Sequence, residues 1–122
     1  MSTLRVSTIQ DTAGSNSSTP AAIANGIAKA WVNFNGTGTV AIRAQYNVSS
    51  ITDNGTGDYT VNLTSALADT NYCATVSGMY STNTSWNGNY TPMALPVSAS
   101  AVRLFWYSGS VDHQYMFCSI NR

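Results

Sequence analysis

Between residues 29 and 120 the sequence consists of short segments in which apolar and polar residues alternate. A period of two places one set of side chains on the buried face of a β-strand and the other on its exposed face. Motifs rich in Asn, Asp and Gly separate the segments, as in tight turns between antiparallel strands. The expected strands cover residues 29–34, 39–43, 48–51, 59–63, 72–80, 101–107 and 114–120. This pattern predicts an all-β fold, an antiparallel β-sandwich of jelly-roll-like type.

The N-terminal part of the chain has a different pattern. Its apolar residues Leu4, Val6 and Ile9 alternate as in a short strand, and a stretch rich in Ser, Thr, Asn and Gly follows them as a linker. Thr19-Pro20 then predicts the start of a short helix, with Thr as the cap and Pro at the first helical position. We therefore expect an arm, linker and helix over residues 1–28 and a sandwich domain over residues 29–122.

Charged residues make up only 8% of the chain, against about 25% in ordinary globular proteins. The five basic residues are scattered, whereas a nucleic-acid site needs them clustered, so we expect no nucleic-acid binding. No apolar run approaches the roughly 20 residues that span a bilayer, so we expect no membrane insertion. Ser, Thr and Asn supply most of the polarity, as suits a secreted or virion-surface β-protein.

Three segments carry a resemblance to a known family. They are Leu4–Gly14, Lys29–Arg43, which contains Ala-Trp-Val-Asn-Phe-Asn-Gly-Thr-Gly, and Asn47–Leu63, which contains Ile-Thr-Asp-Asn-Gly-Thr-Gly-Asp-Tyr. Together they resemble a module that recurs in bacteriophage tail-fibre and virion-surface fibre proteins. The resemblance implies a non-enzymatic structural protein of the virion, exposed on the particle surface and assembled as a homotrimer.

The resemblance leaves the place on the particle open. A tail fibre or fibre tip would present loops for host attachment, whereas a capsid decoration, cement or head-fibre protein would bind the capsid. In both versions the arm with Leu4, Val6 and Ile9 is expected to dock on other virion proteins. A free carbohydrate-binding module is the alternative from another class, and we expect it to be a monomer.

The polar segment 81–92 is the candidate binding loop. Flat aromatic rings beside adaptable amides are typical of surfaces that bind sugars or proteins. The candidate residues for a host cell-surface glycan are Tyr80, Trp86, Asn87, Asn89 and Tyr90. The alternative is that Trp86 folds back as a lid on the sandwich edge.

Aromatic residues near the C-terminus fall on both faces of two expected strands, although one face of an isolated sandwich should be polar. We expect a neighbouring subunit to cover the second face. The candidate interface residues are Phe105, Trp106, Tyr107, Tyr115 and Phe117.

No catalytic, metal or cofactor site is expected. A calcium loop at Asp53–Asp58 is less consistent with the sequence than an Asn-Gly turn, because the segment lacks a bidentate Glu. Asp112-His113 beside abundant Ser lacks a nucleophile elbow, so we expect His113 to be an exposed turn residue. We expect Cys73 and Cys118 to be two buried free thiols rather than a disulfide.

Overall fold

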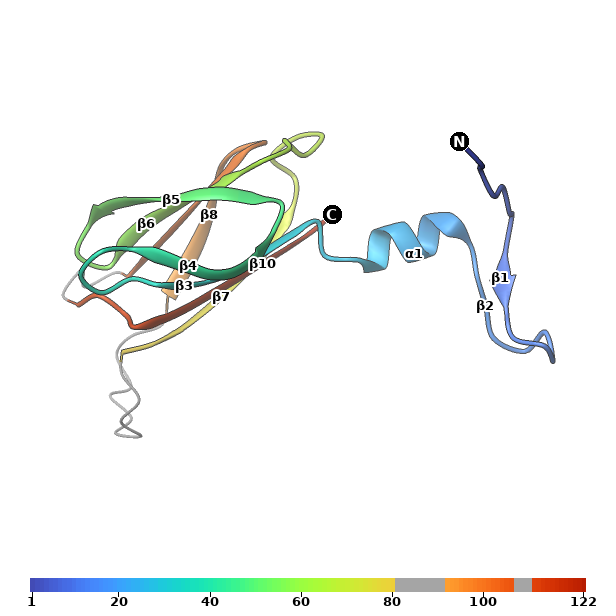
Figure 1. Cartoon of the computed structure of the whole chain (residues 1–122), viewed down its shortest axis with the longest axis horizontal. Helices are drawn as coiled ribbons and strands as arrows, with labels where there is room; N and C mark the ends of the chain where they lie inside the picture. The colour runs from blue at the N-terminus through green and yellow to red at the C-terminus, as the bar shows by residue number, and fades with distance from the viewer. Residues whose placement is uncertain (81–91, 107–110) are drawn as a thin grey trace.

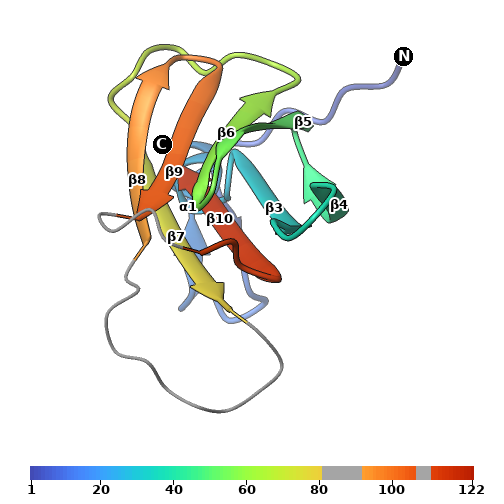
Figure 2. The ribbon, with the colours of Figure 1, turned by 90° about the vertical axis from the view of Figure 1, so that its left-hand side faces the viewer.

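The computed structural model describes residues 1–80, 92–106 and 111–122. In these residues, eight strands form two four-stranded antiparallel sheets that pack face to face (Figure 1, Figure 2). The strand order is β4-β3-β10-β7 in the first sheet and β5-β6-β9-β8 in the second. The expected all-β antiparallel sandwich is therefore confirmed.

The strands of the first sheet are β3 Ala30–Asn35, β4 Ala41–Tyr46, β7 Cys73–Met79 and β10 Tyr115–Asn121. Those of the second are β5 Val48–Gly55, β6 Asp58–Leu63, β8 Pro92–Ser98 and β9 Ala101–Trp106. The hairpins β3–β4, β5–β6 and β8–β9 each stay within one sheet. This connectivity differs from a jelly roll, in which consecutive strands mostly alternate between the sheets.

The arm begins with a small hairpin, and not with the lone strand and linker expected from the sequence. β1 (Ile9–Gln10) pairs antiparallel with β2 (Ser17–Ser18). The Asp11 carboxylate closes the turn, because it accepts hydrogen bonds from the Ser15 backbone N–H at 2.9 Å and the Asn16 side-chain amide at 2.8 Å. Pairing with β2 therefore satisfies some of the backbone N–H and C=O groups that a lone strand would leave without hydrogen bonds.

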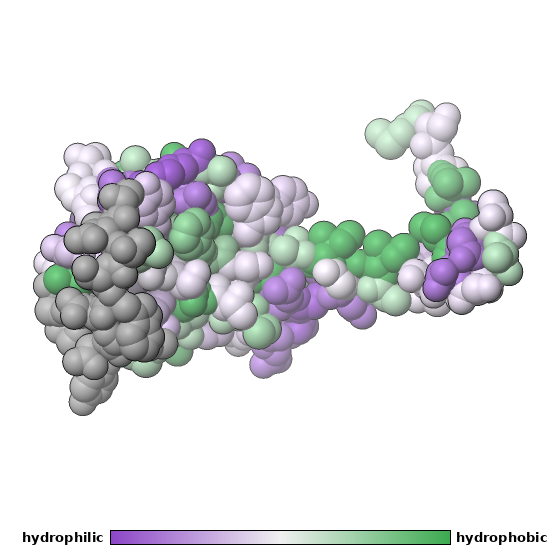
Figure 3. All heavy atoms as spheres, turned by 90° about the horizontal axis from the view of Figure 1, so that it is seen from below, coloured by the Kyte–Doolittle hydropathy of each residue, from purple (hydrophilic) through white to green (hydrophobic). Residues whose placement is uncertain are grey.

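A short helix, α1 (Pro20–Gly26), joins this hairpin to the sandwich. As expected, Thr19 is the N-cap, and its hydroxyl accepts a hydrogen bond from the Ala22 N–H at 3.1 Å. No residue from 1 to 28 is buried, and apolar residues gather along the arm at α1 (Figure 3). The arm extends away from one end of the sandwich (Figure 1).

The hydrophobic core lies between the two sheets. Three aromatic rings form its centre: Phe34 packs edge-to-face on Tyr59 at 5.3 Å between centroids, and Tyr59 on Trp106 at 6.3 Å. Aromatic pairs in this geometry add about 0.5–1.5 kcal/mol beyond the burial of their area. The fully buried aliphatic and sulfur-containing residues around them include Val61, Val102, Leu104, Met116 and Ile120.

One strand, β8, was not expected from the sequence. Its residues include Pro92 and Pro96, and proline cannot donate a hydrogen bond to a ladder. β8 is an edge strand that pairs only with β9, and an edge tolerates proline where the missing N–H would face away from the sheet. The prolines therefore indicate an edge strand and not a loop.

Trp106 provides a test of this core. Its side chain is 4% exposed, whereas Trp31 on the outer face of the first sheet is 41% exposed. We expect Trp106→Ala to lower the free energy of unfolding by about 3–5 kcal/mol, as for other large aromatic truncations in cores. Trp31→Ala is the matched control, with an expected cost below about 1 kcal/mol. Urea unfolding followed by far-UV circular dichroism measures both, and equal costs for the two variants would contradict the packing described here.

Candidate functional site

The two ends of the sandwich differ in the chain segments that are attached to them. The arm enters β3 beside the C-terminus, where the Lys29 N–H donates to the Ile120 carbonyl at 2.7 Å. Strand pairing places the β3–β4, β5–β6, β7–β8 and β9–β10 connections at the opposite end. We call this the distal end (Figure 1). An arm at one end and four chain connections at the other give the molecule a clear polarity.

The candidate binding loop starts and finishes at the distal end. Tyr80, the first of the five candidate residues, is exposed, and its ring packs edge-to-face on His113 with centroids 6.3 Å apart. The other four, Trp86, Asn87, Asn89 and Tyr90, lie outside the described residues. The last residue of β7 and the first of β8, which flank this segment, both lie at the distal end.

His113 is not the exposed turn residue expected from the sequence. Its side chain is 1% exposed, and its ring stacks on Trp106 with centroids 4.0 Å apart and an interplanar angle of 14°. The residue lies two positions before the start of β10. His113 was expected to be exposed because it is a polar residue in a short polar segment. Its stacking on Trp106 is a contact between different segments of the fold, which the local sequence does not indicate.

Asp112 holds the distal connections together. Its Oδ1 accepts a hydrogen bond from the Tyr59 hydroxyl at 2.8 Å and another from the Gly57 N–H at 2.9 Å. The Tyr59 hydroxyl also lies 2.9 Å from the Gly36 carbonyl oxygen, and a Cβ at Gly36 would lie 2.5 Å from that hydroxyl. Burial, and then the hydrogen bond with Asp112, raise the pKa of Tyr59. The carboxylate thus acts as a structural acceptor for the β5–β6 turn and for the core tyrosine on β6.

The five candidate interface residues do not form one surface. Trp106 belongs to the core of its own chain, so its assignment to a subunit interface was wrong. Phe105 lies on the outer face of the second sheet, whereas Tyr115 and Phe117 lie on the outer face of the first. Tyr107 lies outside the described residues. The sandwich therefore presents two separate outer faces, each with exposed apolar side chains.

The outer face of the second sheet is divided in two. Its β8–β9 half carries apolar side chains, whereas the β5–β6 half carries Ser50, Thr52, Thr60 and Asn62. We call the apolar half the aliphatic strip; its residues are Met93, Leu95, Val97 and Phe105. Arg103 lies on the same face opposite Leu95, with its guanidinium over the Phe105 ring, and forms an ion pair with Asp58. Side chains of this kind, with few hydrogen-bonding groups, suit contact with another protein surface.

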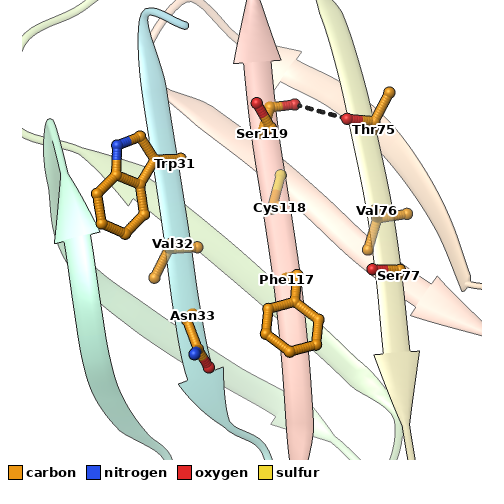
Figure 4. Close-up of a pocket in the computed structure, with 9 residues that line it drawn as sticks. All are labelled: Trp31, Val32, Asn33, Thr75, Val76, Ser77, Phe117, Cys118 and Ser119. Atoms are coloured by element: carbon orange, nitrogen blue, oxygen red, sulfur yellow. Dashed lines mark hydrogen bonds between the residues drawn. The ribbon is translucent and has the colours of Figure 1, made fainter.

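The outer face of the first sheet carries aromatic rings among neutral polar groups. Trp31 on β3 lies opposite Tyr46 on β4 and Ser119 on β10, and Phe117 lies opposite Asn33 and Ser77. An open depression of about 460 Å³ lies among β3, β10 and β7, and Figure 4 shows its lining residues. We call this surface the aromatic groove. Trp31 was not among the candidate residues. Its alternation with the buried Ala30 and Val32 is the sequence signal that places it on the outer face.

The remaining candidates behave as structural elements. Asp53–Asp58 forms the β5–β6 turn, in which the Asp53 carboxylate accepts from the Gly55 N–H at 2.9 Å. Among the described residues no cluster of His, Cys, Asp or Glu could hold a metal ion. Both thiols are free, and burial raises the pKa of Cys118 to about 12. Cys73 is exposed, not buried as expected, because it is the first residue of edge strand β7 and its side chain lies on the outer face.

The three arm candidates, Leu4, Val6 and Ile9, are all exposed. Leu4 and Val6 precede the hairpin, and Ile9 begins it. Exposed apolar side chains on a segment with no buried residue have no core of their own to join. The arm therefore has the composition of a segment that another surface would cover.

His113 predicts how stability depends on pH. Burial lowers the pKa of His113 below its ordinary value of 6.5, so the fold favours the neutral imidazole. Stability is then complete above pH 6.5 and is lost as the pH falls below it, because the unfolded chain binds the proton first. We expect the urea midpoint to fall between pH 7.5 and about 5.5. Since His113 is the only histidine, His113→Gln should abolish this slope; a variant that keeps it would contradict the assignment.

Comparisons with protein-family models, with curated proteins and with solved structures gave no match. Within the described residues, no helix has the length and apolar character needed to cross a bilayer.

Proposed function

We propose that this chain is a structural attachment protein of a bacteriophage virion, a tail fibre or fibre tip, without enzymatic activity. The observation that carries the proposal is the polarity of the molecule, with the arm at one end and the chain connections at the other. A module fixed to a particle through one end presents its opposite end outward. The resemblance of residues 1–63 to phage fibre modules supports the same assignment.

The arm would dock on another virion protein. Its apolar residues Leu4, Val6 and Ile9 are exposed, and the short β1–β2 hairpin has backbone groups on its outer sides that a partner strand could pair with. The helix α1 adds further exposed apolar surface between the hairpin and the sandwich (Figure 3). Docking through this arm would leave the sandwich free to project from the particle.

The sandwich would assemble as a homotrimer through the aliphatic strip. Met93, Leu95 and Val97 follow one another on the outward face of edge strand β8, with Phe105 beside them on β9. Three such strips can meet around a three-fold axis and bury one another, which removes apolar side chains from water. A capsid decoration or head-fibre protein remains the second version of the proposal, since it would use the same arm and the same trimer.

Charge placed in the strip tests the trimer. Leu95→Lys should convert a trimer, of three times the 13.0 kDa chain mass, into a folded monomer, because a buried unpaired ammonium is costly. Ser50→Lys is the control, since Ser50 lies on the polar half of the same outer face and should leave the trimer intact. Light scattering at micromolar concentration measures both. A wild-type chain with monomer mass would refute the trimer and favour a free binding module.

Deletion of residues 1–26 tests the arm. Because none of these residues is buried, we expect the free energy of unfolding of the shortened chain to lie within about 1 kcal/mol of that of the full chain. We also expect the shortened chain to keep its oligomeric mass. Phage that encode the shortened chain should yield particles without it, as judged by immunoblotting of purified virions.

Two sets of point substitutions test which residues of the arm are needed for incorporation into the particle. Replacement of Leu4, Val6 and Ile9 by Ser should also prevent incorporation, whereas Thr3→Ala with Ser7→Ala should not. Loss of folding after the deletion would mean that the arm belongs to the core. Normal incorporation of the deleted chain would exclude docking through the arm.

A further inference from the structure

We propose that the aromatic groove on the first sheet is a binding site for a neutral glycan. It lies on the outer face of the first sheet, none of its lining residues belongs to the arm, and none was among the candidate ligand-binding residues. The proposal rests on the groove's geometry and chemistry, and it depends on the attachment function only for the expectation that the glycan belongs to a host surface.

Two aromatic rings supply the stacking surfaces. Trp31 and Phe117 are each 41% exposed, and they lie on neighbouring strands in diagonal register, since Trp31 is opposite Ser119 and Phe117 is two residues away from it. Diagonal neighbours across an antiparallel pair lie about 7–8 Å apart. Tyr46, opposite Trp31 on β4, extends the row and is also exposed. An extended sugar chain has apolar ring faces that can stack on such a platform.

Neutral polar groups lie where they can orient the sugar hydroxyls. The Arg43 guanidinium donates to Asn33 Oδ1 at 3.4 Å, so the amide nitrogen of Asn33 is the group that can donate to a ligand. The Thr75 hydroxyl donates to the Ser119 carbonyl at 3.4 Å, which fixes its position while its oxygen can still accept (Figure 4). Ser77 and Ser119 add two more hydroxyls on the same face. Small-molecule sites are usually lined by apolar and aromatic side chains with a small number of polar groups.

The absence of charged residues from the lining of the groove disfavours ionic ligands. All nine lining residues are uncharged, and the nearest cation in this network, Arg43, lies over the Tyr115 ring at 4.5 Å as well as on Asn33. An anionic or cationic sugar would lose its hydration without gaining a counter-charge. A neutral sugar loses far less hydration free energy, and its hydroxyls can both donate and accept hydrogen bonds. The chemistry therefore fits neutral hexose, deoxyhexose or N-acetylhexosamine units.

A second copy of the chain fits this face less well than the aliphatic strip does. The groove's amide and hydroxyl groups would be buried against another protein without assured partners, which costs free energy. The groove is an open depression on the outer face of the sheet and not an enclosed cavity. Its volume of about 460 Å³ lies within the range of about 300–1,000 Å³ that is usual for small-ligand sites.

A glycan array tests the proposal on the full-length protein. The array carries neutral oligosaccharides of hexose, deoxyhexose and N-acetylhexosamine, together with sialylated and sulfated members as the charged set. We expect binding to neutral members, and we expect Trp31→Ala and Phe117→Ala each to reduce affinity for the best of them at least tenfold, as measured by calorimetry. Ser50→Ala is the control, because Ser50 lies on the polar half of the opposite outer face, outside both the groove and the aliphatic strip.

Several outcomes would overturn the site. They are no binding to any neutral member, preference for the charged set, or an equal loss in Ser50→Ala. Light scattering on the same samples separates this inference from the proposed function. A trimer that binds no sugar would refute the groove alone, whereas a fall in oligomeric mass in Trp31→Ala would identify the groove as a subunit contact.

Discussion

The pairing of the first and last strands of the sandwich is the interaction on which the rest of the structure depends. β10 lies inside its sheet, between β3 on one side and β7 on the other. The first sheet is therefore incomplete until the C-terminal strand has been added. The same pairing fixes the base of the arm, since the Lys29 N–H continues the ladder to the Ile120 carbonyl. Core, arm and C-terminus are thus positioned by one long-range contact.

The pairing of β3 with β10 also creates the aromatic groove. Trp31 and Phe117 are far apart in the sequence, and they share a face only because these two strands are neighbours. The aliphatic strip, in contrast, arises from the local β8–β9 hairpin. The two outer faces therefore differ in origin as well as in chemistry, which is consistent with separate tasks for them.

Local patterns in the sequence predicted the local parts of the fold. The Asn-Gly motif at Asn54-Gly55 correctly indicated a hairpin, and Thr19-Pro20 correctly indicated the start of the helix. β8 was missed because two prolines made an edge strand resemble a loop. The burial of His113 and Trp106 depends on stacking between segments that turn back over the core, and alternation along one strand carries no information about such a contact. For the same reason the face occupied by each aromatic residue was harder to predict than the strand that contains it.

The two prolines of β8 also limit how copies of this protein can associate. A free strand edge with a full row of N–H groups can template another strand, and the process can repeat without limit as a growing fibril. Pro92 and Pro96 remove two donors from the edge of the second sheet, directly beside the exposed Met93, Leu95 and Val97. Contact at this edge therefore depends on side chains, which match only a partner of complementary shape. The most apolar margin of the sandwich can thus favour a closed assembly while it resists conversion to amyloid.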